Sequence, residues 1–486
     1  MSDISHVDEK ILAKTVQSCR ERGIIIPTFA QQKDPRLIPA KILDRLPTIG
    51  IQDVHPLNLF RITWKNEPVE HGGLFGTGTW LEFPSSLTGV EARIVGLVGR
   101  HFPTGAHKVG AGFGCLVPRL VSGQFDPTSQ KAVWPSTGNY CRGGAFDCAV
   151  LACQAVAILP EQMSQERFDW LRSIGAEVIA TPGCESNVKE IYDKCWEIRK
   201  TRPDCVIFNQ FEEFGNAIWH YETTGGIIEE IFGRIARPGD RLAAYVSATG
   251  SAGTLAAGDY LRTRFPQIRV AACEALQCPT LLQLGFGGHR IEGIGDKHVP
   301  WIHNLRNTDM VIAVDDEQCM SIMRLFNEEA GQTFLAARGV PAKLIAHLPD
   351  AGISSICNLV AAIKLARYYE LGSRDVVFIP LTDSMALYSS RLREQTAEHG
   401  PYTPENAGRH FARYIEAIGI DHLRELNYYD RKSLHQFKYF TWVEQQGRDV
   451  ADLRRLWDPD FWTEVFSQAP EWDRRIEAFN AETGVL

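Results

Sequence analysis

The chain has 486 residues, of which 44% are hydrophobic and 23% charged, so it is long enough to bury two hydrophobic cores. Its 51 basic and 59 acidic residues give a formal net charge of -8 without long runs of either sign, which argues against nucleic acid or an anionic membrane as a partner. The longest strongly apolar stretch, residues 149–159, is too short to cross a bilayer, and the first residues lack a signal sequence, so we expect a cytoplasmic protein.

The predicted elements begin in an N-terminal extension, residues 1–84, where residues 9–21 have a helical pattern and Pro35, Pro39 and Pro47 interrupt the connection that follows. Beyond it, strand-like and helix-like segments alternate, which favours parallel sheets covered by helices on both faces. We predict strands at 131–135, 155–159, 176–181, 206–209, 242–246, 270–274 and 376–380, and helices at 143–154, 163–173, 217–232, 255–263, 317–337 and 355–370.

From about residue 399 the chain becomes polar and aromatic, and four tryptophans stand there among charged residues, namely Trp442, Trp457, Trp462 and Trp472. Exposed tryptophans in such numbers usually become buried, so we expect the ends of the chain to cover a functional cleft or to pack at a subunit interface. Twelve cysteines are scattered without a Cys-x-x-Cys pair, which indicates reduced thiols and no metal site.

A lysine stands among glycines and small residues in the segment Pro103-Thr104-Gly105-Ala106-His107-Lys108-Val109-Gly110. By itself, such a lysine is ordinarily a solvated loop residue. About thirty positions later, however, the chain contains Pro135-Ser136-Thr137-Gly138-Asn139, a turn with two hydroxyl groups and an amide. A lysine that is close to polar turns of this kind is suited to form a Schiff base with a carbonyl compound.

A second glycine-rich segment, Ser247-Ala248-Thr249-Gly250-Ser251-Ala252-Gly253-Thr254, follows a predicted strand and precedes a predicted helix. Small residues at this place let backbone N–H groups and hydroxyls approach an anion near a helix N-terminus, so the segment is typical of a phosphate site. An ordinary strand-to-helix turn is the alternative interpretation, and the segment lacks the Gly-Lys-Ser/Thr of a Walker loop.

Further motifs follow in order: Asn209-Gln210-Phe211-Glu212, Thr223-Thr224-Gly225, His289-Arg290-Ile291-Glu292-Gly293-Ile294-Gly295, Ala351-Gly352-Ile353-Ser354-Ser355 and Ile379-Pro380-Leu381-Thr382-Asp383-Ser384. Together with the lysine segment and the two turns, they resemble the pyridoxal-phosphate enzymes of fold type II, most closely the cysteine synthase and cystathionine beta-synthase family. The resemblance covers residues 85–395, about two thirds of the chain, and leaves both ends outside it.

This resemblance implies an α/β fold with two doubly wound parallel-sheet domains of the tryptophan synthase beta-like architecture. We expect a smaller domain at 85–215, which carries the Schiff-base lysine and the loop for the substrate carboxylate. A larger domain at 216–398 is expected to carry the phosphate loop and a serine that meets the pyridine nitrogen. Residues 1–84 and 399–486 are then N- and C-terminal extensions, and a homodimer is the family expectation.

The resemblance also implies the cofactor, pyridoxal 5'-phosphate, and the residues that hold it. Lys108 matches the Schiff-base lysine, Asn139 the asparagine that hydrogen-bonds the ring hydroxyl, and Ser384 the hydroxyl partner of the pyridine nitrogen. The phosphate loop is expected to supply Ser247, Thr249, Gly250, Ser251, Gly253 and Thr254. The substrate, a small amino acid, is expected to meet Ser136, Thr137, Gly138, Tyr140, Arg142, Gln210 and Gly293.

In such an enzyme the incoming amino acid displaces Lys108 from the cofactor, and the conjugated ring absorbs the carbanion left when Lys108 removes the α proton. A neutral serine at the pyridine nitrogen limits full quinonoid formation and favours chemistry at the β carbon. The expected activity is β-elimination or β-replacement through an aminoacrylate, as in a lyase or transferase of the cysteine synthase type. The alternatives are a serine/threonine dehydratase-like or threonine synthase-like enzyme, and a catalytically silent amino-acid- or protein-binding relative.

Two departures from the close relatives concern the substrate. Tyr140-Cys141-Arg142 stands where they usually have small residues, and the planar guanidinium of Arg142 suits an acidic group on the substrate. An arginine on the helix surface is the alternative for Arg142. Asp296, just after the glycine loop, is expected either to act as an acid or base on a leaving group or to pair with Lys297.

Overall fold

The computed structural model describes residues 6–68, 71, 73–184, 187–294 and 297–485 and contains two sheets. Four short apolar runs form the smaller sheet. Its strands are parallel in the order β5-β4-β3-β6. Side chains of β3 alternate between two faces, because Val133 packs in one buried cluster and Ala132 and Trp134 in another. The strands are β3 (Lys131–Pro135), β4 (Gln154–Pro160), β5 (Glu177–Thr181) and β6 (Cys205–Ile207).

The larger sheet has the order β1-β2-β10-β7-β8-β9-β11, with antiparallel strands at its two edges and parallel strands between them. Its last parallel strand in the sequence, β10, lies between two strands from much earlier in the chain. The strands are β1 (Trp80–Phe83), β2 (Arg93–Val98), β7 (Arg241–Ala248), β8 (Arg269–Ala275), β9 (Met310–Val314), β10 (Asp375–Leu381) and β11 (Leu423–Glu425).

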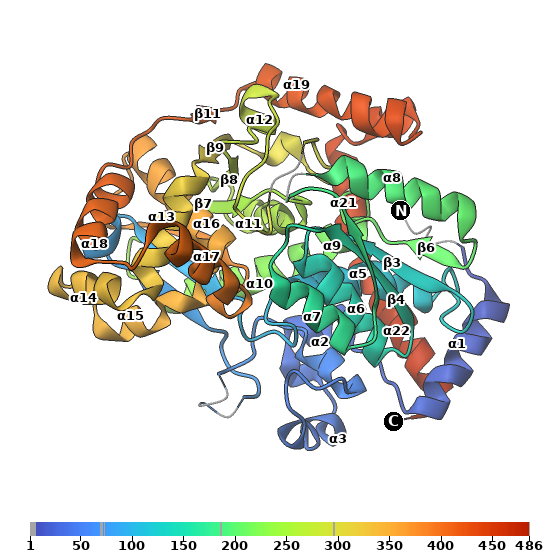
Figure 1. Cartoon of the computed structure of the whole chain (residues 1–486). Coiled ribbons are helices and arrows are strands. Elements are labelled where there is room, and N and C mark those ends of the chain that lie inside the picture. The colour runs from blue at the N-terminus through green and yellow to red at the C-terminus, as the bar shows by residue number, and fades with distance from the viewer. Residues whose placement is uncertain (1–5, 69–70, 72, 185–186, 295–296, 486) are drawn as a thin grey trace.

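Helices cover both faces of each sheet, as Figure 1 shows. On the larger sheet, α10 (Gly226–Ile235) and α11 (Ala256–Arg264) share one core with the sheet, whereas α13 (Asp316–Asn327) and α16 (Ile353–Tyr368) share the other. The inner strands β9 (Met310–Val314) and β10 (Asp375–Leu381) are buried throughout and almost wholly apolar, as expected for strands with both faces covered. The sequence-based prediction of parallel sheets with helices on both faces is confirmed.

The division of the chain between the sheets is not linear. Strand β1 comes from the predicted N-terminal extension, β2 from the range predicted for the smaller domain, and β11 from the predicted C-terminal extension, yet all three belong to the larger sheet. The ranges 1–84, 85–215, 216–398 and 399–486 therefore do not coincide with the sheets. Strand pairing between segments hundreds of residues apart leaves no local pattern in the sequence from which those boundaries can be drawn.

The remaining helices of the two domains flank these sheets. They are α4 (Ser85–Thr88), α5 (Lys108–Leu120), α6 (Asn139–Val150), α7 (Gln165–Ser173), α8 (Val188–Thr201), α9 (Phe214–Trp219), α12 (Thr280–Gln283), α14 (Glu329–Ala337), α15 (Ala342–His347) and α17 (Ser389–His399). The helix predicted at 317–337 is broken at Glu328, whose backbone is extended, with φ -98° and ψ 144°. The helix predicted at 217–232 contains a π-helical segment, η5 (His220–Gly225), that carries one buried histidine toward the site described below.

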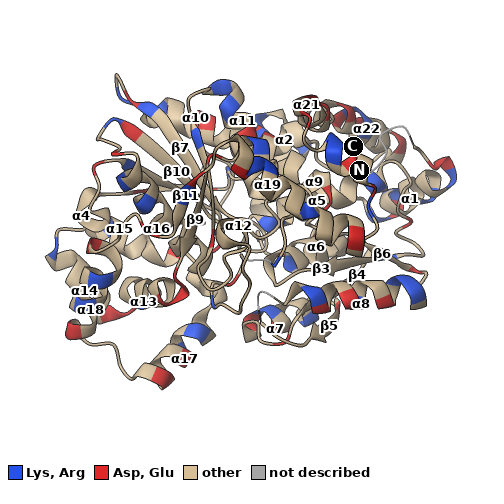
Figure 2. Ribbon diagram, turned by 90° about the horizontal axis from the view of Figure 1, so that it is seen from above, with Lys and Arg blue, Asp and Glu red and all other residues tan. Residues whose placement is uncertain are grey.

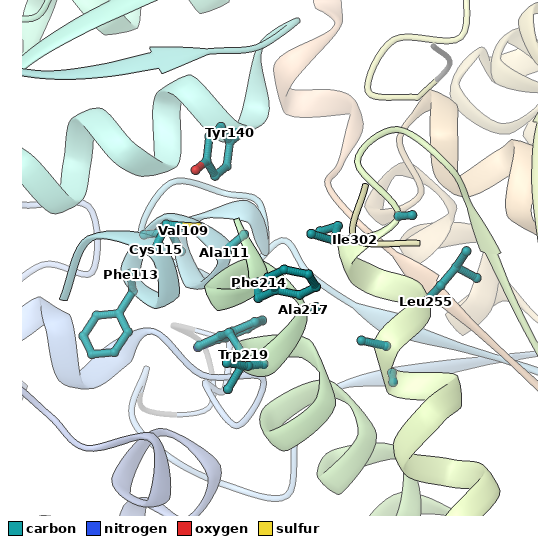
Figure 3. Close-up of a cluster of buried hydrophobic side chains, with 14 of the residues drawn as sticks. Val109, Ala111, Phe113, Cys115, Tyr140, Phe214, Ala217, Trp219, Leu255 and Ile302 are labelled. Carbon is teal, nitrogen blue, oxygen red and sulfur yellow. The ribbon is translucent and has the colours of Figure 1, made fainter. Parts of the chain in front are cut away.

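Two glycines of α5 allow a close approach between that helix and α9. A Cβ at Gly110 would overlap the ring of Trp219, and the backbones of Gly114 and Gly215 are in contact. Figure 3 shows the apolar side chains that fill the space around this contact, with Phe113 from α5 and Phe214 from α9 among them. This packing fixes the first turn of α5, where Lys108 stands.

The first and the last helix of the chain pack against each other. N-terminal α1 (Glu9–Arg22) and C-terminal α22 (Ala469–Thr483) lie side by side in Figures 1 and 2. The Arg20 guanidinium donates to the Thr483 carbonyl oxygen over 3.0 Å, and the Asn480 side chain bonds the backbone of Ile26 in both directions. The other helices of the ends are α2 (Phe29–Lys33), α3 (Ala40–Leu43), α18 (Pro404–Phe411), α19 (Tyr428–Lys438), α20 (Val450–Arg455) and α21 (Pro459–Phe466).

Most of the C-terminal tryptophans are buried. Trp442, Trp462 and Trp472 are at most 4% exposed, and the Trp442 indole donates to the Val299 carbonyl oxygen over 2.8 Å. On the outer surface, basic and acidic residues are interspersed along the helices, as Figure 2 shows. Within the described ranges, no helix is both long enough and apolar enough to cross a bilayer.

Candidate active site

A cavity lies where β3, β7 and β10 end, between the two sheets. In parallel sheets, the loops after the carboxyl ends of the strands line the ligand crevice. The described lining consists of His107, Lys108, Ser136, Thr137, Asn139, Tyr140, Gln210, Phe211, Ala248, Gly250, Ser251, Ala252, Thr254, Gly293, Ile294 and Thr382. The lysine segment, the Ser-Thr-Gly-Asn turn, the glycine-rich segment and Gln210 thus converge on one cavity from distant parts of the sequence.

Lys108 begins α5, and its amino group lies between two polar side chains of the cavity. It donates to Gln210 Oε1 over 3.1 Å and to Ser251 Oγ over 2.9 Å. Burial lowers the pKa of Lys108 from 10.5 to about 8, and no carboxylate accepts a hydrogen bond from it among the described residues. A substantial fraction of the amine is therefore neutral near pH 8, which suits a nucleophile or a general base.

The other titratable side chains of the described lining do not change charge near neutrality. Burial lowers the pKa of His107 to about 3, and burial raises the pKa of Tyr140 well above 10. Lys108 is therefore the lining residue in the described part of the cavity that can exchange a proton near neutral pH.

The glycine-rich segment exposes free backbone donors to the cavity. The backbone N–H groups of Gly250, Ser251 and Ala252 have no hydrogen-bond acceptor among the described residues. They stand just before the 3-10 turn Gly253–Leu255, which leads into α11. Several N–H groups at the start of a helix form a site for an anion such as phosphate.

Three residues of the predicted phosphate loop are not part of that lining. Both the backbone N–H and the hydroxyl of Thr249 donate to the Cys273 carbonyl oxygen, so the Thr249 side chain is directed at β8. Ser247 is buried in β7. Gly253 faces Asn216, because a Cβ at this position would overlap the Asn216 amide.

The Ser-Thr-Gly-Asn turn is held from behind by a buried arginine. Arg167 Nη1 donates to the Thr137 carbonyl oxygen over 2.7 Å, and the Gly138 N–H donates to Ser136 Oγ over 3.1 Å. Gly138 has φ +152°, and a Cβ there would overlap the Arg167 guanidinium. Glycine is therefore required at this turn for both backbone and steric reasons.

Asn139, the last residue of the turn, begins α6 and lines the cavity. Its Nδ2 donates to Asp383 Oδ2 over 2.6 Å, whereas its Oδ1 is buried without a hydrogen-bond partner. A buried amide with one unused oxygen and one unused hydrogen is ready to bond a polar group in the cavity.

Two hydroxyl residues follow β10. Thr382 lines the cavity, but its hydroxyl is bonded to Ser354 Oγ over 2.7 Å. Ser384 is buried next to it, and its hydroxyl makes no hydrogen bond to the described residues. Of the two, Ser384 has the hydroxyl group without a hydrogen bond, but it is not among the residues of the described cavity lining.

Arg142 does not reach the cavity. Its guanidinium lies 4.5 Å from the centre of the Trp170 ring, and its Nε and Nη1 have no hydrogen-bond acceptor among the described residues. Burial lowers the pKa of Arg142 to about 10, with a smaller effect from the neighbouring Arg167. Arg142 is therefore not among the residues of the described cavity lining, and it is not a surface arginine either. Asp296 lies outside the described residues.

His107 and the N-terminal extension form the wall behind Lys108. The ring of His107 lies between the Thr382 carbonyl oxygen (Nδ1, 3.1 Å) and the Thr254 hydroxyl (Nε2, 3.4 Å), and it stacks on Trp64 with ring centres 5.7 Å apart. Because this histidine is neutral, Nδ1–H donates to Thr382 and Nε2 accepts from Thr254. The Trp64 indole donates to Thr224 Oγ1 over 2.8 Å, so the extension is anchored to η5.

Some lining residues were not singled out from the sequence. Phe211, Ile294 and Thr382 are adjacent to or near the predicted residues Gln210, Gly293 and Ser384, so the motifs themselves contained them. Arg167 lies outside every motif, and Asp383 was not singled out although it stands in the motif of Ser384. Their roles depend on contacts with residues 30 and 244 positions away in the sequence.

A model of the pyridoxal-phosphate dependent enzyme family matches residues 97–340, half of the chain. This chain is a pyridoxal-phosphate dependent enzyme. A cysteine synthase of Staphylococcus aureus is 31% identical to the enzyme over 249 residues, which are 51% of this chain and 73% of that protein. A probable cysteine synthase of Bacillus subtilis is 30% identical over 230 residues, 47% of this chain and 72% of its own.

Solved structures agree with the fold of this pyridoxal-phosphate enzyme. A hydrogen sulfide-producing enzyme from Fusobacterium nucleatum superimposes with a TM-score of 0.55 at 23% identity, over 70% of this chain and 95% of that one. An O-acetylserine dependent cystathionine beta-synthase from Helicobacter pylori gives a TM-score of 0.53 at 24% identity, over 65% and 95% of the two chains. The predicted family, fold type II architecture and cofactor are confirmed.

The residues of the cavity fit pyridoxal 5'-phosphate. The free N–H groups at Gly250, Ser251 and Ala252 suit its phosphate, and the Lys108 amine suits its aldehyde. The unused polar atoms of Asn139 suit its ring hydroxyl. When bound, the cofactor supplies an electron sink for the carbon atom that loses its proton.

Proposed function

We propose that this enzyme catalyses β-elimination or β-replacement on an amino acid that carries a leaving group at its β carbon. The observation that carries the proposal is the position of Lys108 between Gln210 Oε1 and Ser251 Oγ, in a cavity whose described lining has no other group that titrates near neutrality. The relatives named cysteine synthase, and the hydrogen sulfide-producing enzyme of related fold, support the same reaction class.

Lys108 is proposed to move the proton. Its amine, with a pKa lowered to about 8, takes the proton from the α carbon and becomes an ammonium group. Gln210 Oε1 and Ser251 Oγ are both acceptors for that ammonium, so the charge that forms on Lys108 is stabilised where it forms. The bond from the β carbon to the leaving group then breaks, and the leaving group departs with the electron pair.

The Ser-Thr-Gly-Asn turn and Gln210 are proposed to bind the substrate carboxylate. Ser136, Thr137 and Gln210 line the same cavity as Lys108 and provide two hydroxyls and an amide. The turn begins a helix, α6, whose first N–H groups favour an anion. Tyr140 and Gly293 are placed by the same proposal around the substrate, whereas Arg142 is not assigned to it.

Ser384 is proposed as the partner of the pyridine nitrogen. A serine hydroxyl is neutral and does not protonate that nitrogen, and it has no competing hydrogen bond to the described residues. A nitrogen that stays largely unprotonated withdraws fewer electrons, which favours departure of a β substituent over racemisation or transamination.

A panel of amino acids tests the reaction. Purified enzyme with pyridoxal 5'-phosphate is incubated with O-acetylserine, serine, cysteine, threonine or O-phosphohomoserine, each with and without a thiol. Release of keto acid, acetate, sulfide or phosphate and formation of a thioether are then measured. We expect turnover with at least one β-substituted substrate and its loss in Lys108→Ala. Lys343→Ala, at an exposed position of α15, is the unaffected control.

The other outcomes discriminate the alternatives. Turnover of serine or threonine alone, without thiol addition, indicates a dehydratase, and phosphate release from O-phosphohomoserine indicates a threonine synthase-like γ reaction. Cofactor binding without turnover of any of these substrates contradicts the proposal and favours a silent binding protein. We also propose a homodimer in the cytoplasm, which light scattering of the purified protein and imaging of a tagged chain would check.

A further inference from the structure

Asp383 lies directly behind Asn139 and is fully buried. Its Oδ2 accepts two hydrogen bonds, one from Asn139 Nδ2 over 2.6 Å and one from the Tyr388 hydroxyl over 2.5 Å. Its Oδ1 has no hydrogen-bond partner among the described residues and faces the backbone of Gly352, where a Cβ would overlap it. A single carboxyl oxygen therefore holds Asn139 and Tyr388 together.

Arg167, which contacts the Tyr388 hydroxyl, fixes the direction of these hydrogen bonds. Arg167 Nη2 donates to the Tyr388 hydroxyl oxygen over 2.9 Å, and a guanidinium has no acceptor, so this bond cannot reverse. The Tyr388 hydrogen is then donated to Asp383 Oδ2, which must be an acceptor. If Asp383 carries a proton, that proton belongs on Oδ1, so Oδ2 accepts in either protonation state.

An acceptor at Asp383 Oδ2 selects one orientation of the Asn139 amide. The nitrogen end must face Asp383, because the oxygen end would bring two acceptors together. The amide nitrogen has two hydrogens, and Asp383 takes one of them. The nitrogen lies 3.9 Å from the position of a Cβ on Gly293, a residue of the cavity lining, and its second hydrogen has no acceptor among the described residues.

We propose that Asp383 is a positioning residue that, with Tyr388 and Arg167 behind it, makes Asn139 a hydrogen-bond donor toward the ring oxygen of the cofactor. The inference rests on the proposed function only in that the enzyme binds pyridoxal 5'-phosphate with Asn139 at the ring hydroxyl, and it does not depend on the reaction that the enzyme catalyses. Since a donor stabilises the ionised form of a phenolic oxygen, Asp383 shifts the bound cofactor toward its ionised ring oxygen. An ionised phenolic ring absorbs at longer wavelength than its protonated form.

The absorption spectrum of the bound cofactor is therefore the readout, without any substrate. We expect Asp383→Ala and Asn139→Ala each to lower the ratio of long- to short-wavelength absorbance roughly tenfold, as for the loss of one hydrogen bond to a charged group. The double variant is expected to show no further change, because both substitutions remove the same interaction. Asp383→Asn retains an oxygen that can accept from Tyr388 and Asn139, so it is expected to restore most of the ratio.

Asp375→Ala is the matched control, since this buried carboxylate begins β10, the strand that ends just before Asp383, and pairs with Arg241 instead. Tyr388→Phe provides a milder test if Asp383→Ala fails to fold, and we expect it to shift the ratio in the same direction. A normal ratio in Asp383→Ala, or additive effects of Asp383→Ala and Asn139→Ala, would overturn the proposal. Failure of the substrate panel leaves this spectrum unchanged, so the two proposals fail separately.

Discussion

The side-chain nitrogen of Asn216 donates to the Ser251 hydroxyl over 2.9 Å, and the same hydroxyl accepts from Lys108. This nitrogen also donates to the Gln210 carbonyl oxygen over 3.0 Å. Asn216 thus holds both residues that contact the lysine amine, although it does not line the cavity itself.

We expect Asn216→Ala to reduce kcat/KM by roughly tenfold to a hundredfold, because Ser251 and Gln210 lose the group that holds them in place. The buried Gln210 carbonyl loses its donor as well, which costs roughly 1–3 kcal/mol in the free energy of unfolding. Steady-state kinetics and urea denaturation measure both. Asn327→Ala on α13, which removes a local bond to the Met323 carbonyl oxygen, is the control, and an equal kinetic loss there would contradict this role.

Formation of the Lys108 Schiff base is expected to depend on pH around the lowered pKa of about 8. Below that pH the amine is protonated and cannot attack a carbonyl, whereas above it the neutral amine predominates. Stopped-flow mixing of apoenzyme with pyridoxal 5'-phosphate should give a rate that rises with pH and levels off above about 8. A rate that still rises steeply up to pH 10 would show an ordinary lysine pKa.

The same shift predicts a cost in stability. The pKa of Lys108 is lower in the folded chain than in the unfolded chain, so the unfolded state binds more protons between about pH 8 and pH 10.5. The contribution of this group to the free energy of unfolding therefore rises with pH through that window. Below this pH window, the buried ammonium group of Lys108 lowers the free energy of unfolding by its full amount. Apoenzyme carrying Lys108→Met is therefore expected to be more stable than wild type at pH 7 by about 1–3 kcal/mol. Equal stability of the two apoenzymes would contradict a penalty of this kind.

Gly138→Ala is expected to distort the turn that is proposed to receive the substrate carboxylate. The new Cβ would overlap the Arg167 guanidinium at a backbone φ of +152°, for a cost of roughly 2–5 kcal/mol. Calorimetry and the KM for the best substrate of the panel measure the effect. Gly175→Ala is the control: with φ +82° and no atom within 4 Å of the new Cβ, it introduces only backbone strain and should leave KM unchanged.

The N-terminal extension is expected to be necessary for the site. Trp64→Ala removes the ring stacked on His107 and the bond to Thr224, so we expect a loss of roughly 3–5 kcal/mol and weaker cofactor retention. Trp64→Phe keeps an aromatic ring and loses the hydrogen bond, for about 1 kcal/mol. Denaturation and cofactor titration compare the variants. Wild-type cofactor affinity in Trp64→Ala would contradict a role of the extension in cofactor binding.

The sequence allowed most of the core to be predicted, because its signals are local. Strand β3 has the predicted bounds, and α11 begins one residue from its predicted start. Lys108 and Gln210 were predicted as site residues from short motifs, and the fold brings them together in one cavity. The roles of these residues in binding and catalysis stay predictions.

What the sequence did not reveal arises from contacts between distant segments. Asp383 stood inside a predicted motif, but its contact with Asn139 exists only because β10 ends beside α6. Arg142 follows Asn139 by three residues on α6, which suggested a place in the cavity, yet its side chain lies over the Trp170 ring of α7 instead. That contact depends on how α6 packs against α7, which the motif does not contain.

The central place of β10 in the larger sheet sets an order for synthesis of the chain. All strands of the smaller sheet lie within residues 131–207, so that sheet can form as soon as this stretch has left the ribosome. The larger sheet has a gap between β2 and β7 until residues 375–381 emerge. During that interval β2 and β7 present unpaired edges to the solvent. The nascent chain is therefore expected to be most prone to aggregation before β10, whose end borders the catalytic cavity, has been added to the sheet.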